Sequence, residues 1–153
     1  MFNILFMISV VIPVYNERDN VKLLYEKIKE TAHKMGEVFE IIFVDDGSTD
    51  DTVAILKTLP GIKILVLTMD FGQTSALDAG IHEAQGEIII TMDGDLQNDP
   101  ADIPQLAAKI REGYDVVSGW RKSRDDSSGR RILSRCANWL TTKVTGLGLH
   151  DSG

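Results

Sequence analysis

The sequence predicts an α/β fold in which a mostly parallel sheet carries helices on both faces. Apolar runs rich in β-branched residues alternate with segments whose apolar residues recur every three or four positions. Polar clusters rich in aspartate and glycine follow the ends of several runs. Strands that alternate with helices imply parallel pairing through right-handed crossovers. With 153 residues the chain is long enough to bury a core, and it fits a single domain, residues 1–153.

The apolar runs are the predicted strands. Each is short and nearly continuous in apolar residues, and each is bounded by glycine, proline or acidic residues, which is typical of strands buried on both faces. In chain order, the predicted strands span about 8–14, 40–44, 62–67, 87–92 and 114–118.

Segments of helical periodicity lie between the strands and after the last one. In the third of them, we expect Leu77, Gly80, Ile81 and Ala84 to face the sheet. The predicted helices begin at Asp19 or Asn20, at Ser48 or Thr49, after Gln73, at Pro100 with Asp99 as the cap, and before Leu133.

Charge, cysteine content and hydropathy argue against a nucleic-acid platform, an intrachain disulfide, a signal peptide and a membrane span. A formal net charge of −7 argues against a nucleic-acid platform, which normally presents a basic face. The single cysteine, Cys136, cannot form an intrachain disulfide, which favours a reducing compartment. The apolar start lacks a basic region and a cleavage site, so we interpret it as the approach to a first strand and not as a signal peptide. No run of about 18 apolar residues is present to span a bilayer.

The most informative stretch follows the fourth strand. Asp93 and Asp95 flank Gly94, and Gln97 lies two residues further along. Side chains alternate along an extended backbone, so the two carboxylates are expected to point the same way, while Gly94 lets the chain turn and a ligand approach. Such hard oxygen ligands suit Mg²⁺ or Mn²⁺ that enters with a phosphate-bearing substrate. The alternative, in which the acids only cap the next helix, requires no acid other than Asp99.

Polar clusters after the other strands are expected to meet at the same edge of the sheet, because ligands of parallel α/β sheets bind beyond the carboxyl ends of the strands. Tyr15, Glu17 and Asp45 offer hydrogen-bonding groups for the base and ribose of a nucleotide. A cation held by Asp95 and Gln97 would stabilise a leaving diphosphate. The clusters are Pro13 to Glu17, Asp45 to Ser48, Asp93 to Gln97, and Arg121.

Arginines after the fifth strand suggest a second phosphate site. Arg121, with Arg130 or Arg131, presents planar guanidinium groups that can bind phosphate oxygens in pairs. A cation site beside an arginine site indicates transfer of a sugar between two phosphates. The alternative for each arginine is a solvated basic loop.

Taken in chain order, six segments resemble the family 2 glycosyltransferases, and within them the dolichyl- or polyprenyl-phosphate glycosyltransferase branch. The resemblance implies a GT-A fold, here a single catalytic domain that is incomplete at its carboxyl terminus. It also implies a GDP- or UDP-sugar donor, Mg²⁺ or Mn²⁺, and inversion at the anomeric carbon. The segments are 9–17, 43–50, 71–73, 76–80, 92–100 and 113–121.

The same resemblance assigns roles to individual residues. It implies that a lipid monophosphate, already ionised at neutral pH, attacks without a general base, so that Asp151 orients the sugar or the acceptor. The implied nucleotide-binding residues are Pro13, Tyr15, Glu17, Asp45, Asp46 and Asp93; the metal ligands are Asp93, Asp95 and Gln97; the acceptor-phosphate residues are Arg121, Arg130 and Ser134; and the catalytic residues are Asp93, Asp95, Arg121 and Asp151.

The expected partners are a nucleotide sugar and a lipid phosphate at a membrane surface, with no nucleic acid. A second copy of the chain is a further candidate partner, because apolar surface left by an incomplete domain favours pairing. The expected location is the cytoplasm or the cytoplasmic face of a membrane.

Alternative functions remain open from the residues alone. The chain is either a transferase of this kind, a non-catalytic remnant that binds sugar nucleotides, or a family 2 transferase acting on a sugar hydroxyl, for which the region of Asp151 would supply a base. A haloacid-dehalogenase-like phosphatase needs its paired aspartates after the first strand, and here they follow the fourth. A nucleotidyltransferase needs a glycine-rich basic loop where this chain has residues 13–17.

Overall fold

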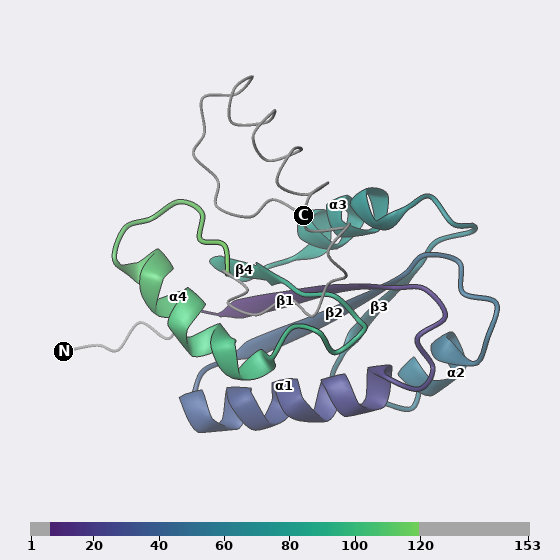
Figure 1. The fold of residues 1–153 in the computed structure, drawn as a ribbon, viewed down its shortest axis with the longest axis horizontal. Coiled ribbons are helices and arrows are strands. Elements are labelled where there is room, and N and C mark those ends of the chain that lie inside the picture. Colours follow the sequence, from purple (N-terminus) through teal and green to yellow (C-terminus); the bar gives the residue numbers. More distant parts are fainter. Residues whose placement is uncertain (1–6, 120–153) are drawn as a thin grey trace, which may run out of the picture. The chain divides into compact units, whose positions relative to one another are not determined.

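The computed structural model describes residues 7–119. The chain divides into two compact units, residues 1–115 and 116–153, and every described helix and strand belongs to the first unit. The predicted α/β class is confirmed (Figure 1). The elements are β1 (Ile8–Val14), α1 (Val21–Met35), β2 (Phe39–Asp45), α2 (Thr52–Leu56), β3 (Lys63–Val66), α3 (Gln73–Glu83), β4 (Ile88–Thr91), the 3-10 turn η1 (Pro100–Asp102) and α4 (Ile103–Arg111).

The described strands form one parallel sheet of four, in the order β3-β2-β1-β4. All seven residues of β1 are buried, as expected for a central strand covered on both faces. After β1 the chain builds β2 and β3 on one side and then returns to place β4 on the other. The boundary between β1 and β4 is therefore the switch point at which open α/β sheets bind their ligands.

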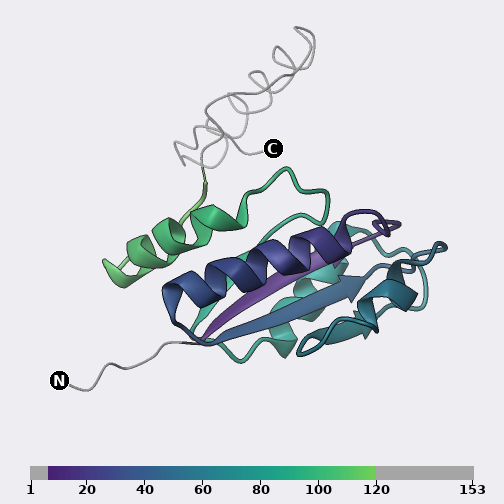
Figure 2. The ribbon, with the colours of Figure 1, turned by 90° about the horizontal axis from the view of Figure 1, so that it is seen from below.

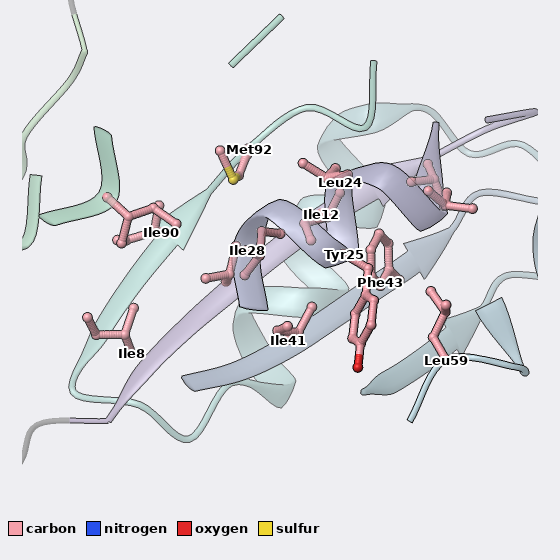
Figure 3. Packing of buried hydrophobic residues seen from close by; sticks show 14 of the residues in the cluster. Ile8, Ile12, Leu24, Tyr25, Ile28, Ile41, Phe43, Leu59, Ile90 and Met92 are labelled. Atoms are coloured by element: carbon pink, nitrogen blue, oxygen red, sulfur yellow. The ribbon is translucent and has the colours of Figure 1, made fainter. Parts of the chain in front are cut away.

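Helices cover both faces of the sheet, as predicted. Helices α1, α2 and α4 lie on one face and α3 lies on the other (Figures 1 and 2). On the α1 face, Leu24 and Ile28 pack over Ile12 and Phe43, all fully buried (Figure 3). The strands bury alternate residues on the α3 side, where Val11 and its neighbours form a smaller cluster with Ala76. This two-sided burial is what the continuous apolar runs require.

Helix α3 packs on the sheet through its smallest residues. Ala76 and Gly80 are buried and lie four positions apart, so they share one helix face. A Cβ atom at Gly80 would lie 2.4 Å from Cγ1 of Val11 and 2.9 Å from Cγ2 of Val44. The prediction that Gly80 faces the sheet is confirmed. The same prediction for Ile81 is wrong, because Ile81 is 41% exposed. Helix α3 lies closest to the sheet at its small residues Ala76 and Gly80. Ile81 follows Gly80 in the helix, so its side chain points about 100° away from the direction of the sheet.

The start of helix α2 and the predicted fifth strand also differ from prediction. Helix α2 starts at Thr52 and not at Ser48 or Thr49, since the backbone N–H of Thr49 donates to the Asn16 side chain across two loops. Residues 114–118 were expected to form a fifth strand, but they form none, and Val116 is 84% exposed. Apolar β-branched residues favour a strand only where another strand pairs with them, and no described strand does so here.

Asp99 caps the turn that precedes α4, as predicted. Its Oδ1 accepts a hydrogen bond from the backbone N–H of Ala101 at 3.1 Å, and Pro100 occupies the first position. Among residues 7–119, no helix is long and apolar enough to cross a membrane. The predicted final helix near Leu133 and the single Cys136 lie outside the described residues.

The strands are joined at their amino-terminal edge around Glu40. Its Oε2 accepts hydrogen bonds from the Ser9 hydroxyl and from the backbone N–H of Gln85 at 2.9 Å. Its Oε1 lies 2.7 Å from Nζ of Lys63. Burial alone would raise the pKa of Glu40, but the hydrogen bonds from Lys63, Ser9 and a backbone N–H lower it below its ordinary value. The ionised carboxylate therefore stabilises the folded state.

Replacing Glu40 with glutamine is expected to lower the free energy of unfolding at pH 7 by about 1–2 kcal/mol, because charge-assisted hydrogen bonds are lost. The pKa of Glu40 is depressed on folding, so its contribution is complete above the unfolded pKa of about 4.3 and disappears as the pH falls through the folded pKa. Urea unfolding from pH 7 downward should show the difference between wild type and variant disappearing once the pH falls below the depressed folded pKa of Glu40. The exposed ion pair of Glu30 with Lys34 supplies the control, because Glu30→Gln should leave stability nearly unchanged. A difference that persists at low pH would contradict the electrostatic explanation.

Candidate functional site

A cleft of about 410 Å³ opens beyond the carboxyl ends of the strands. It receives residues from the segments that follow β1, β2, β3 and β4, and it spans the switch point between β1 and β4. The predicted convergence of polar clusters at one edge is thus seen for the clusters that follow β1, β2 and β4. The lining residues are Pro13, Val14, Tyr15, Glu17, Asp46, Asp70, Gln73, Asp93, Gly94 and Asp95.

The cleft is strongly acidic. Five of its lining residues are aspartate or glutamate, and within residues 7–119 no lysine or arginine lines it. Such a surface repels a diphosphate and attracts cations, because like charges at short range raise the energy of the complex. A phosphate-bearing ligand therefore needs positive charge to bind here, and the described lining residues supply none.

Asp93 and Asp95 reach the cleft through a turn. Strand β4 ends at Thr91, Gly94 and Asp95 lie in a turn, and Leu96 follows with a φ of +65°. The turn that Gly94 was expected to allow is present, and both carboxylates line one cleft, whereas the expected extended backbone with alternating side chains is wrong here. A Cβ at position 94 would lie 2.8 Å from Cγ1 of Val14. Glycine at position 94 therefore lets the turn press against the end of β1.

Hydrogen bonds hold both carboxylates. Asp95 Oδ1 accepts from the backbone N–H of Gln97 at 3.0 Å. Asp93 Oδ1 accepts from the side-chain Nε2 of Gln73 at 2.7 Å, while its backbone N–H donates to Asn98 Oδ1 at 3.1 Å. The side chain of Gln97, a predicted metal ligand, is not among the groups that line the cleft.

The two aspartates at the end of β2 have different environments. Asp45 is fully buried, and its Oδ2 accepts from the backbone N–H of Ser48 at 3.0 Å, whereas its Oδ1 has no hydrogen-bond partner among the described residues. Asp46 lines the cleft, but both of its oxygens accept backbone N–H bonds, from Phe71 and Gly72, each at 2.9 Å. Asp46 thus fixes the loop after β3, a role that the sequence did not suggest.

Asn16 connects the loops after β1 and β2. Its φ is +55°, a left-handed conformation that asparagine tolerates better than most residues. Its backbone N–H donates to Ser48 Oγ at 2.9 Å, and its Oδ1 accepts from Thr49 at 2.8 Å. Asn16 therefore fixes the backbone between Tyr15 and Glu17, which both line the cleft. Sequence reasoning missed this role, since an asparagine between two site residues was the only signal.

Gln73 is the second residue that sequence reasoning missed. It is the first residue of α3, it lines the cleft, and it contacts Asp93 across twenty sequence positions. The only signal was its place in the segment 71–73, to which no role was attached.

Among the described residues, no group of three or more histidine, cysteine, aspartate or glutamate side chains is arranged to hold a metal ion by itself.

Five candidate site residues lie outside the described residues. They are Arg121, Arg130, Arg131, Ser134 and Asp151.

Solved structures identify the fold. Glucosyl-3-phosphoglycerate synthase from Mycobacterium tuberculosis, in complex with Mn²⁺, UDP and phosphoglyceric acid, matches with a TM-score of 0.76 and 24% identity over 96% of this chain and 52% of that one. A mannosyltransferase from Pyrobaculum calidifontis in complex with GDP-Man and Mn²⁺ matches with a TM-score of 0.57 and 27% identity, over 67% of this chain and 31% of that one. The fold is therefore GT-A, as predicted.

The family follows from the sequence comparison. The model described as glycosyl transferase family 2 matches residues 9–149, so the chain belongs to that family. It is 43% identical to a dodecaprenyl-phosphate galacturonate synthase from Rhizobium johnstonii, over 95% of this chain and 45% of the relative. It is 40% identical to an undecaprenyl-phosphate 4-deoxy-4-formamido-L-arabinose transferase from Proteus mirabilis, over 95% of this chain and 46% of the relative. The chain thus spans less than half the length of these curated relatives.

Proposed function

We propose that this chain is the donor-binding part of an inverting, metal-dependent glycosyltransferase that moves a sugar from a nucleotide-diphosphate sugar to a polyprenyl or dolichyl monophosphate. One observation carries the proposal: Asp93 and Asp95 line a single cleft with Tyr15 and Glu17 at the carboxyl ends of the strands. Membership of family 2 supports it, as do the polyprenyl-phosphate substrates named for both relatives.

The residues of the cleft fit a divalent cation. Mg²⁺ is usually held by one or two carboxylates together with substrate phosphates, and Asp93 and Asp95 provide two carboxylates. When bound, Mg²⁺ or Mn²⁺ supplies positive charge that stabilises the leaving diphosphate. The amide oxygen of Gln97 is the third proposed ligand. The Mn²⁺ in the two similar solved structures supports the same class of ion for this chain.

The nucleotide is proposed to lie against the end of β1. Tyr15 is about half exposed and offers a ring face and a hydroxyl group, and Glu17 offers acceptors. Asp45 Oδ1 is buried, and no residue within 7–119 hydrogen-bonds to it, which is costly; a nucleotide N–H or O–H that reaches it would satisfy that oxygen. Pro13 forms part of the wall. Asp46 is proposed to act by positioning, because both of its oxygens are already hydrogen-bonded.

The acceptor is proposed to be a lipid phosphate. Arg121, Arg130 and Ser134 bind its phosphate group, and Asp151 orients the reacting groups. A phosphate monoester is ionised at neutral pH, so its oxygen attacks the anomeric carbon without a general base while the diphosphate leaves. A lipid acceptor implies action at a membrane surface, and we propose the cytoplasmic face as the location.

Metal-dependent nucleotide binding tests the donor half. Calorimetric titration of the chain with UDP and with GDP should give binding in Mn²⁺ or Mg²⁺ that is weaker by at least about tenfold in EDTA, because the acidic cleft then repels the diphosphate. The base with the higher affinity identifies the donor. Equal affinity with and without metal would contradict the proposed role of Asp93 and Asp95.

Transfer of a labelled sugar from the identified donor tests the reaction. Labelled polyprenyl-phosphate sugar is the expected product. Product formed only with sugar-hydroxyl acceptors would favour the hydroxyl-directed alternative, and donor binding without transfer would favour a non-catalytic remnant.

A further inference from the structure

A side-chain hydrogen bond of Gln73 links the start of α3 to the segment after β4 inside the cleft. Its side-chain Nε2 donates a hydrogen bond of 2.7 Å to Asp93 Oδ1, and both residues line the cleft. Gln73 belongs to the start of α3, whereas Asp93 follows β4. The contact is therefore a tertiary one between the first residue of α3 and the segment after β4, and it touches one of the two carboxylates proposed to hold the cation.

The backbone that carries Gln73 is itself anchored. Both oxygens of Asp46 accept N–H bonds from the two residues before Gln73, and Asp70 Oδ1 accepts a further bond from Gly72 at 2.9 Å. The loop also lies directly on the end of β2, since a Cβ at Gly47 would be 2.6 Å from the backbone carbon of Met69. The donor group of Gln73 is thus presented from a fixed backbone.

The contact contributes little to the hydrophobic core. Gln73 is exposed to solvent and belongs to neither buried apolar cluster. An exposed side chain that is anchored at its base and directed at a cleft carboxylate has a local effect: it restricts the orientations of that carboxylate. A replacement that removes the donor should therefore leave the stability of the fold nearly unchanged.

The chemistry of an amide suits this position. A neutral N–H donor orients a carboxylate and leaves its negative charge intact, whereas a lysine at the same place would cancel the charge that attracts a cation. Groups that orient metal-binding carboxylates typically change metal affinity by 10–100-fold when they are removed.

From these observations, and resting on the proposed function, we infer that Gln73 is a positioning residue that acts through Asp93. Its hydrogen bond holds the Asp93 carboxylate in the orientation that accepts the divalent cation of the nucleotide-sugar donor.

The test uses the full chain with Gln73→Met, which keeps the length of the side chain and removes the donor. The matched control is Gln105→Met, on an exposed position of α4 that does not line the cleft. Mn²⁺ binding is measured by electron paramagnetic resonance in the presence of UDP and, in parallel, GDP. We expect the Kd for Mn²⁺ to rise about tenfold in Gln73→Met and to stay unchanged in Gln105→Met. Tm and nucleotide affinity in EDTA should be the same in all three proteins.

Several outcomes would overturn the inference. One is an unchanged Kd for Mn²⁺ in Gln73→Met, and another is an equal loss of nucleotide affinity in EDTA, which would indicate general damage to the cleft. Gln73→Ala removes the donor with a residue of high helix propensity, so it must give the same loss of Mn²⁺ affinity as Gln73→Met. If the wild-type chain binds no Mn²⁺ with either nucleotide, the proposed function fails, and the proposed role of Gln73 fails with it. If wild type and Gln73→Met bind Mn²⁺ equally well, only the role of Gln73 fails.

Discussion

Asp95→Asn is expected to remove the metal-dependent part of nucleotide binding. Asparagine has nearly the same shape, and its oxygen can still accept the backbone N–H of Gln97, so the turn should persist. The loss of one carboxylate charge next to the proposed cation should weaken nucleoside diphosphate binding in Mn²⁺ by about 100-fold or more, because losing a direct ligand costs at least as much as losing a group that only orients one, for which 10–100-fold is typical. Because Asp95 is exposed, Tm should change little.

The same variant should have the opposite sign of effect in EDTA. Without metal, the cleft acids repel a diphosphate, and removing one of them should strengthen binding slightly. Asp102→Asn is the matched control, because Asp102 is an exposed acid close in sequence that does not line the cleft. Titration heats in Mn²⁺ that do not differ between Asp95→Asn and wild type would refute the assignment of Asp95.

Gly80→Val is expected to destabilise the fold by about 3 kcal/mol, at the upper end of the cost of overpacking. The added Cβ would lie 2.4 Å from Val11 Cγ1 and 2.9 Å from Val44 Cγ2, distances that force α3 away from the sheet. Both neighbours are fully buried and β-branched, so neither can rotate away easily. The small gain in helix propensity over glycine, under about 1 kcal/mol, does not offset this cost.

Urea unfolding measures the effect on the free energy of unfolding. Thr74→Val introduces the same residue at an exposed position of the same helix and should stay within about 0.5 kcal/mol of wild type. Val11→Ala should relieve part of the clash, so the cost of Gly80→Val should be smaller in that background. Additive losses in the double variant would mean that the contact with Val11 is not the cause.

The strands and the location of the cleft were predictable because their causes lie in local pattern and general topology. The run from Ile8 to Val14 is apolar except for Ser9, and only a strand buried on both faces accommodates it. Once such strands are parallel, their carboxyl ends share one edge, which brings Tyr15, Asp93 and Asp95 to one cleft.

The remaining features depend on contacts between segments far apart in the sequence. A turn at Gly94 was expected, but the left-handed Leu96 and the close contact of that turn with the end of β1 were not. The roles of Asp46 and Gln73 follow from loops that meet only in the folded chain. The inward face of α3 is set by glycine and alanine, which a hydrophobic pattern ranks below isoleucine.

Strand β2 carries Glu40 near its start and Asp45 at its end, so a single strand separates two tasks. Five residues of extended chain place these positions about 17 Å apart, well beyond the distance at which salt screens exposed charges. Substitutions intended to raise Tm can therefore be confined to the amino-terminal edge of the sheet. Changes there should leave the cleft at the carboxyl ends of the strands unaffected.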